Sequence, residues 1–431
     1  MEVPIRYGSG AVTFEVPSGS VAGVLRPRPP AATGAPVSLA QRLEGQLDRA
    51  EANCAGRDLL VLVADGTRDQ AHAAAYAALG PLLAAARTVR VVLATGTHQT
   101  DTPDNRGIAD EIAGVSARLG VPLSSVEAHD CHASETYGIG TTSRGNRVLL
   151  NRRVADAQAV LIVSDMRPHY FAGYSNATKF LLPGVAAFAS IERDHAWALD
   201  PLAGHSRHPH QPDPARRRNP VAENQLEAAR RVAEETPVYA LGTVTADRRV
   251  LWAAFGEIEQ VVSEGIASVD AHLVARVRRP ARRVVIGCGG YPNDETLYIA
   301  QRSLELTKEA VADGAEVVWL AACANGIASS ERAVRAFFEP LHAGRAAYVR
   351  RVRERYVMFS HKTVKFVEML ERLGALHVKS ELPPDRLPPG MTPCDDPRQV
   401  VSAWVERGER VLFIEDANTL AVMLSAAVPG V

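Results

Sequence analysis

The sequence predicts an α/β fold made of two domains, each with a mainly parallel sheet, and an active site in the cleft between them. The chain has 431 residues, which is long for one hydrophobic core and typical of two domains. Apolar runs of strand length alternate with segments of helical periodicity, which is the pattern of parallel sheets covered by helices. Such sheets bind ligands beyond the carboxyl ends of their strands, so residues that follow a strand are the first candidates for a site.

The N-terminal domain is expected over residues 1–275. It opens with a β-hairpin around Ser9 and Gly10, followed by the proline-rich connector RPRPPAATGAP. The pattern then predicts helix 38–53, strand 58–64, helix 71–86, strand 89–94, helix 102–119 and strand 159–163. After a polar, proline-rich loop that ends near residue 220, we expect helix 221–235, strands near 238–244 and 250–254, and helix 257–276.

The C-terminal domain is expected over residues 276–431. The basic, proline-broken segment ARVRRPARR is the expected linker to it. The α/β pattern then restarts with strand 284–287, the turn GGYP, helix 295–313 and strand 315–321. It is completed by helices 330–338 and 363–373 and by strands near 376 and at 410–414.

Composition narrows the class of protein. The formal net charge of −1 gives no electrostatic reason to expect a nucleic-acid partner, and no apolar run approaches the length that spans a membrane. The five cysteines are scattered without a CxxC pair, so we expect neither a disulfide framework nor a thiolate metal site. The N-terminus lacks the features of a signal peptide, and we therefore expect a cytoplasmic protein. The oligomeric state cannot be read from the sequence.

The segment DGTR follows the first predicted strand and combines Asp65, Thr67 and Arg68. Backbone N–H groups at a helix start, with the hydroxyl and the guanidinium, suit a phosphate or a carboxylate, and Asp65 suits a ribose or another polar donor. A helix cap with a surface ion pair explains the same residues equally well. Neither GxGxxG nor GxxxxGK occurs at this position.

Two histidines also follow predicted strands, His98 in TGTH and His169 in RPHYF. A single histidine at such a position is more often structural. Two imidazoles that face one ligand are what a two-base racemase requires, because an imidazole with a pKa of about 6.5 can accept a proton while its protonated partner donates one. The presence of both histidines therefore favours a catalytic role over a structural one.

The segment from Arg167 to His195 is broken by glycines and prolines, which allows Lys179 and His195 to converge with His169. Apolar neighbours of Lys179 would desolvate its amine and favour covalent chemistry with a carbonyl-type electrophile, although a surface lysine at the start of an apolar strand is the simpler alternative. The His195 imidazole suits a metal ion. No other ligand lies at standard spacing, so most ligands of such a metal would come from outside the protein.

Other histidines are weaker candidates. The cluster HDCH, with His129 and His132, is a less favoured metal site. The histidines of the proline-rich loop, His205, His208 and His210, are expected to be solvated.

These motifs together resemble a known family. They are DGTR at 65–68, TGTH at 95–98, HYFAGYS with Lys179 and LLPG at 169–184, His195, Asn219-Pro220, and GGYPNDETLY at 289–298. In this order, across residues 60–330, they resemble the nickel-pincer-nucleotide-dependent lactate racemase (2-hydroxyacid racemase) family.

The resemblance implies a cofactor and roles for the residues. The cofactor would be the nickel pincer nucleotide, pyridinium-3,5-bisthiocarboxylic acid mononucleotide nickel, made by separate cofactor-synthesis enzymes. Lys179 matches the lysine that tethers it and His195 the histidine that completes the nickel coordination. His98 and His169 match the two acid/base histidines, and Asp65, Thr67 and Arg68 match anchors of the cofactor or substrate.

The implied reaction is racemisation or epimerisation of a small 2-hydroxy acid by proton-coupled hydride transfer. One histidine removes the hydroxyl proton while the α-hydrogen moves to the cofactor, and hydride then returns to the other face of the 2-keto acid. A cation must hold the substrate carboxylate. Arg302 is the candidate, since it lies one helical turn beyond Tyr298.

Two departures from the family bear on the substrate. The family's YSGGRK is replaced by YSNATK at 174–179, and its LYQAQK by LYIAQR at 297–302. The second change puts apolar Ile299 in place of glutamine and a forked guanidinium in place of an ammonium. We therefore expect a bulkier 2-hydroxy acid than lactate. A divalent-metal hydrolase or lyase and a non-catalytic anion-binding homologue remain alternatives.

Overall fold

The computed structural model describes residues 1–28, 38–68, 70–246, 249–328, 330–342 and 345–425. Most of the proline-rich connector lies outside these residues. The chain forms two compact units. The N-terminal unit comprises Pro29–Arg167 and Phe171–Val269, and the C-terminal unit comprises Met1–Arg28, Pro168–Tyr170 and Asp270–Val431. Each unit contains a mainly parallel sheet covered by helices, so the predicted α/β fold class is confirmed.

The N-terminal unit is built on a six-stranded sheet with the order β13-β12-β9-β4-β5-β6. Only β13 runs antiparallel to its neighbour. In β4 every residue from Leu59 to Val63 is buried, as expected for a strand covered on both faces. The strands are β4 (Asp58–Val63), β5 (Thr88–Leu93), β6 (Leu123–Ala128), β9 (Ala159–Asp165), β12 (Val238–Ala246) and β13 (Arg249–Glu257).

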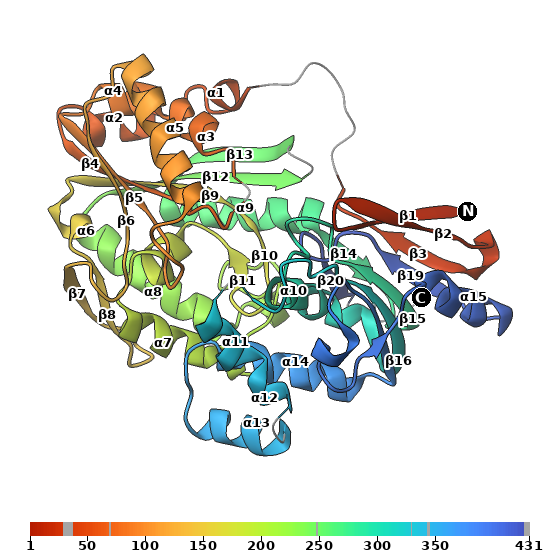
Figure 1. The fold of residues 1–431 in the computed structure, drawn as a ribbon. Coiled ribbons are helices and arrows are strands. Elements are labelled where there is room, and N and C mark those ends of the chain that lie inside the picture. The colour runs from red at the N-terminus through yellow and green to blue at the C-terminus, as the bar shows by residue number, and fades with distance from the viewer. Residues whose placement is uncertain (29–37, 69, 247–248, 329, 343–344, 426–431) are drawn as a thin grey trace. The chain divides into compact units, whose positions relative to one another are not determined.

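Helices cover both faces of this sheet, and Figure 1 shows α1 to α5 on one side of it and α9 (Ile258–Leu273) on the other. Tyr76 and Ile112 bury their side chains with Val61 and Val91 in one apolar core. Gly242 in β12 lets α9 approach closely, because a Cβ atom there would lie 2.6 Å from Val261 Cγ1. The helices of the first face are α1 (Leu39–Arg42), α2 (Asp48–Cys54), α3 (His72–Ala78), α4 (Gly80–Ala84) and α5 (Pro103–Leu119).

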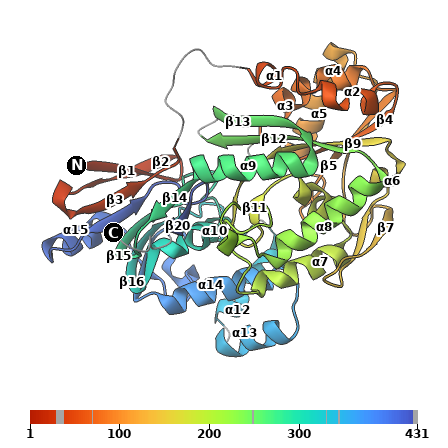
Figure 2. The same cartoon turned by 180° about the vertical axis from the view of Figure 1, so that it is seen from behind.

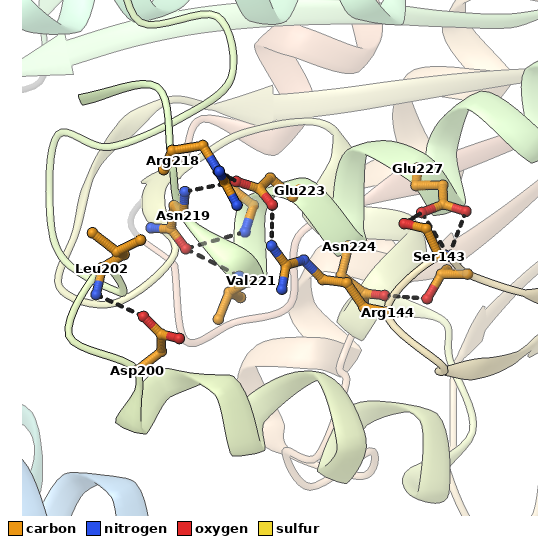
Figure 3. Close-up of polar contacts among 12 residues, drawn as sticks. Ser143, Arg144, Asp200, Leu202, Arg218, Asn219, Val221, Glu223, Asn224 and Glu227 are labelled. Carbon is orange, nitrogen blue, oxygen red and sulfur yellow. Dashed lines mark hydrogen bonds and ion pairs between the residues drawn. The ribbon is translucent and has the colours of Figure 1, made fainter. Parts of the chain in front are cut away.

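The helix α8 (Pro220–Glu235) begins at the predicted Asn219-Pro220 motif. The Asn219 side chain accepts hydrogen bonds from the backbone N–H groups of Val221 and Ala222, at 3.1 and 3.3 Å, and so caps the helix. Figure 3 shows Glu223 in the first turn, paired with Arg144 and Arg218. These contacts fix the start of α8 against the turn between β7 (Thr136–Thr141) and β8 (Arg147–Asn151).

The C-terminal unit has a parallel six-stranded sheet with the order β18-β17-β16-β15-β19-β3. One face packs on α10 and α14 through residues such as Leu304 and Phe366. The other face packs on the β1–β2 hairpin and α15 (Figure 2). Phe14 and Trp404 are buried in this layer. The elements are β1 (Glu2–Tyr7), β2 (Gly10–Glu15), β3 (Val21–Leu25), β15 (Ala281–Gly287), β16 (Val311–Leu320), β17 (Ala375–Lys379), β18 (Thr392–Pro393), β19 (Val411–Ile414), α10 (Leu297–Thr307), α14 (Ser360–Arg372) and α15 (Pro397–Glu406).

Met1–Arg28 differs from the expected domain organisation, which placed it with the N-terminal domain. It groups with the C-terminal unit because β3 pairs in parallel with β19, between Val24 and Phe413 among others. The hairpin predicted around Ser9 and Gly10 is confirmed.

Two predicted helices end earlier than expected. The helix expected to reach residue 276 stops at Leu273, because residues 274–277 of the expected linker form β14 (Val274–Val277), which pairs with β20 (Ala421–Leu424). The helix expected to reach residue 313 stops at Thr307, before β16 begins at Val311. In both places the sequence continues the apolar spacing of a helix, but the residues pair with a neighbouring strand instead.

The remaining elements are short. They are α6 (Arg153–Asp156), α7 (Phe188–Ala196), α11 (Glu331–Phe337), α12 (Glu339–His342), α13 (Arg345–Glu354), β10 (Arg167–His169) and β11 (Gly173–Ser175). Among the described residues, no helix combines the length and the apolar character that crossing a membrane requires.

Candidate functional site

Asp65 and His98 form a hydrogen-bonded pair at the ends of the adjacent strands β4 and β5. The Nδ1 atom of His98 lies 2.7 Å from Oδ2 of Asp65, and the hydroxyl of Thr67 donates to Oδ1 at 2.7 Å. Asp65 is buried, whereas the His98 side chain is 46% exposed. The carboxylate therefore fixes the orientation of an imidazole whose other edge remains accessible.

The charges around Asp65 keep it ionised. Burial by itself would raise the pKa of the carboxyl group, but His98, Thr67 and Arg68 outweigh that effect and lower it. Arg68 is half-buried, and desolvation lowers the pKa of its guanidinium, while the nearby charges of Asp65 and Asp165 act in the opposite direction. Asp165 ends β9, so three strand ends of this sheet contribute to one polar cluster.

Lys179 and His195 lie around the same aromatic ring. The Lys179 Nζ atom is 5.7 Å from the centroid of the Phe171 ring, and the His195 ring meets Phe171 edge-on at 5.1 Å. Lys179 is 9% exposed and the His195 side chain 12% exposed. The structure thus brings together two candidates that are separated by a turn-rich stretch of sequence.

The carboxylate of Asp194 lies close to the His195 ring. Its Oδ2 atom lies 3.3 Å from the Nδ1 atom of His195. The Asp194 carboxylate is fully buried and accepts hydrogen bonds from the side-chain amides of Asn224 (2.8 Å) and Gln225 (3.0 Å) on α8. A carboxylate at one imidazole nitrogen is the usual outer partner of a metal-binding histidine, and the sequence did not reveal it.

The segment that carries Lys179 is held by the proline-rich loop before α8. The amide of Asn219 donates to the carbonyl of Phe171 at 2.9 Å, and the N–H of Ser206 donates to the carbonyl of Gly173 at 3.1 Å. Gly173 has a φ of +79°, and a Cβ atom there would lie 1.8 Å from the carbonyl oxygen of Arg207. Only glycine allows this approach.

The departure from the family at residues 176–178 has a local structural role. The side-chain oxygen of Asn176 accepts from the N–H and the hydroxyl of Thr178, at 2.8 and 2.7 Å. The carbonyl of Asn176 accepts from the N–H of Lys179 at 3.1 Å. An Asx turn therefore shapes the backbone directly before the lysine, where the family has glycines.

The expectation that the loop histidines are solvated is wrong for His205 and His208, which are 1% and 0% exposed. The loop folds back onto β11, so that the His208 ring meets the Tyr174 ring edge-on at 6.3 Å. Burial, with the nearby charges of His210 and Arg230, lowers the pKa of His208 to about 3.

The HDCH cluster has a structural explanation. His129 is buried, with Nε2 at 2.9 Å from the carbonyl of Ala186 and Nδ1 at 3.1 Å from the amide of Asn151. Burial lowers its pKa. Across the part of the chain that the structure describes, no three His, Cys, Asp or Glu residues are grouped as metal ligands. The cysteines are all free thiols.

The remaining candidates, His169, Tyr298 and Arg302, belong to the C-terminal unit. Tyr298 and Arg302 lie one turn apart on α10. His169 stacks on the ring of Tyr170, with 5.1 Å between centroids. Burial raises the pKa of Tyr170, and nearby Tyr298 adds to the effect.

The sequence did not identify Lys362 as part of this region. Its Nζ atom lies 3.5 Å from the centroid of the Tyr298 ring and donates to the Tyr298 carbonyl at 2.7 Å. The nine predicted site residues thus form one set in each unit: Asp65, Thr67, Arg68, His98, Lys179 and His195 in the N-terminal unit, and His169, Tyr298 and Arg302 in the C-terminal unit. Convergence of the two sets on one ligand stays a prediction.

Sequence comparison relates the chain to lactate racemases. Residues 7–205 match the lactate racemase N-terminal domain. A lactate racemase of Thermoanaerobacterium thermosaccharolyticum is 25% identical over 344 residues, which cover 75% of each chain. A lactate racemase of Lactiplantibacillus plantarum is 20% identical over 253 residues, covering 55% of this chain and 53% of that relative. The resemblance predicted from the motifs is confirmed.

Solved structures share the fold. The lactate racemase apoprotein from Thermoanaerobacterium thermosaccharolyticum superimposes with a TM-score of 0.82 at 21% identity, over 98% of this chain and 100% of that chain. A protein from Thermotoga maritima gives a TM-score of 0.67 at 16% identity, over 91% and 99% of the two chains. At these identities the likeness establishes the α/β fold.

Proposed function

We propose that this chain, whose residues 7–205 carry a lactate racemase N-terminal domain, is a racemase or epimerase of a 2-hydroxy acid. The observation that carries the proposal is the Asp65–His98 pair, at 2.7 Å. A carboxylate that holds one imidazole nitrogen leaves the other as a general base of fixed orientation, and a racemase needs such a base at the substrate hydroxyl. The sequence assigned Asp65 to the cofactor, and its contact with His98 favours an orienting role instead.

The cofactor in this proposal is the nickel pincer nucleotide, which supplies reversible acceptance of hydride from the substrate carbon. Lys179 would tether it and His195 would complete the nickel coordination. Their common position around the Phe171 ring supports this assignment, as does the carboxylate of Asp194 at the far nitrogen of His195. Thr67 and Arg68, at the end of β4, would hold an anionic group of the cofactor or substrate.

The chain's own residues would handle the protons and the carboxylate. His98 takes the hydroxyl proton from one enantiomer, and His169 serves the opposite one. The guanidinium of Arg302 binds the carboxylate, with Tyr298 beside it on α10. Ile299 makes part of that wall apolar where the family has a glutamine, which favours a 2-hydroxy acid with a larger apolar side chain than lactate.

A divalent-metal hydrolase or lyase has less support, because within the described residues no protein ligand set of three is grouped for a metal. A non-catalytic anion-binding homologue would have no use for the buried carboxylate at His98. Cofactor-synthesis enzymes are the expected partners, and a cytoplasmic location stays a prediction.

The test is co-expression with cofactor-synthesis enzymes. Intact mass should reveal an adduct on the wild type that is absent from Lys179→Ala. Chiral chromatography should then show inversion of one or more acids in a panel from lactate to aromatic 2-hydroxy acids. An unmodified wild-type chain under these conditions, or a loaded chain that inverts no acid in the panel, would overturn the proposal.

A further inference from the structure

Tyr170, His361 and Tyr356 form a chain of three polar side chains next to His169 in the C-terminal unit. The hydroxyl of Tyr170 lies 3.2 Å from Nε2 of His361, and the hydroxyl of Tyr356 lies 2.6 Å from Nδ1 of the same ring. His361, at the start of α14, is 3% exposed. None of the roles proposed above uses it.

Both ring nitrogens of His361 have a tyrosine hydroxyl as a hydrogen-bond partner. A neutral imidazole carries one N–H donor and one acceptor, and each tyrosine hydroxyl can act as either. The ring is therefore held from two sides, and loss of either partner would leave a polar nitrogen unpaired in a buried position, which is costly.

Tyr170 transmits this constraint to His169. Its ring stacks on the His169 imidazole, with centroids 5.1 Å apart and planes inclined by 24°. The ammonium of Lys362, next to His361 on α14, lies 5.5 Å from the centroid of the Tyr170 ring. His361 therefore contacts the hydroxyl of Tyr170, and Lys362 lies over its ring. Both residues help to hold the tyrosine that stacks on His169.

We propose that His361 is a positioning residue that acts through Tyr170 to hold the imidazole of His169 in the orientation needed for proton transfer. The inference rests on the proposed racemase function, in which His169 is one of two acid/base groups. Small misplacements of a reacting group have large effects on rate, so a residue that never touches the substrate can control turnover.

Three substitutions separate this role from simple packing. In His361→Gln the side-chain amide reaches the position of Nε2 and can keep the contact with Tyr170. In His361→Asn it reaches only the position of Nδ1 and can keep the contact with Tyr356. His361→Phe fills the space and removes both hydrogen bonds.

In the loaded enzyme we expect His361→Gln to retain kcat within about threefold, and His361→Asn and His361→Phe to lower kcat by about 10- to 100-fold with KM within about twofold. Tyr170→Phe should lower kcat by as much as His361→Asn does. It provides a second variant if the His361 variants fail to fold. Equal kcat values for the Gln and Asn variants would show that His361 only fills the core, and would overturn the proposal.

A measurement on the protein without cofactor makes the inference independent of turnover. The ring current of Tyr170 should displace the His169 Hε1 proton resonance, assigned with His169→Asn. We expect this displacement to persist in His361→Gln and to diminish in His361→Asn. An identical resonance in both variants contradicts the positioning role. A wild type that inverts no 2-hydroxy acid but keeps this pattern contradicts only the proposed function.

Discussion

The Nδ1 atom of His98 lies 2.7 Å from the Oδ2 atom of Asp65, although 33 residues separate the two in sequence. The contact exists because β4 and β5 are parallel neighbours whose carboxyl ends meet at one edge of the sheet. It joins an accessible imidazole to a buried, ionised carboxylate. The strength of this pair can be tested directly.

Asp65→Asn should lower kcat of the loaded enzyme by about 100-fold or more, because an amide neither stabilises the imidazolium nor selects the tautomer that leaves Nε2 as the base. Steady-state racemisation rates at saturating substrate measure the effect. Thr67→Ala is the matched control, since it removes the 2.7 Å bond to Asp65 but keeps the carboxylate, and should cost less than about tenfold. Comparable losses in both variants would mean that the carboxylate has no special role.

Asp194→Asn should weaken the retention of nickel while leaving the lysine-linked adduct in place. The carboxylate lies at Nδ1 of His195, and loss of such an outer partner typically costs about 10- to 100-fold in metal affinity. Nickel content by elemental analysis and adduct mass by intact mass spectrometry report the two properties separately. Lys179→Ala, which should lose the adduct itself, is the reference. Full nickel content in Asp194→Asn would argue against His195 as the ligand.

The pair Ile299→Gln and Arg302→Lys should shift specificity towards lactate. Together these changes restore the family's LYQAQK sequence on α10 and make the wall beside Tyr298 polar. We expect the ratio of kcat/KM for lactate to that for a larger 2-hydroxy acid to rise by about tenfold or more, the size of effect that one pocket contact produces. Arg302→Ala should instead lower kcat/KM for all substrates. An unchanged ratio in the double variant would remove Ile299 and Arg302 from the specificity argument.

His208 should make the protein less stable in acid. Its pKa is lowered from the usual 6.5 to about 3 by burial, so between these values the unfolded chain binds a proton that the folded chain does not. The contribution of neutral His208 is therefore complete above about pH 6.5 and declines as pH falls, by at most about 1.4 kcal/mol per pH unit.

Urea unfolding at pH 7, 5.5 and 4.5 measures this contribution. His208→Asn keeps an acceptor near the Nδ1 position, which receives the backbone N–H of His210 at 3.1 Å, but does not titrate. The free energy of unfolding of this variant should fall less steeply with decreasing pH than that of the wild type. Parallel curves would show that His208 does not titrate differently in the two states.

Much of the architecture and the list of candidate residues could be predicted from local patterns. The apolar run of β4 and the helical period of α5 identify these elements because burial on a strand or helix repeats at a fixed spacing. Polar residues after β4 and β5 marked the candidate site because parallel sheets of this kind bind ligands beyond the carboxyl ends of their strands. The ordered motifs also resemble those of the lactate racemase family, and the comparisons confirm this resemblance, with residues 7–205 matching the lactate racemase N-terminal domain.

What the sequence by itself determined was therefore the fold class, the resemblance to lactate racemases and the identity of the candidate side chains. Only the tertiary structure decided which of them meet: Asp65 with His98, Asp194 with His195, and Tyr170 with His361, 191 residues away. It also placed β3 beside β19 and buried His208. The physical reason is that a period along the chain reports which face of an element is buried, whereas a contact between distant residues depends on how separate elements pair and pack, which no local pattern encodes.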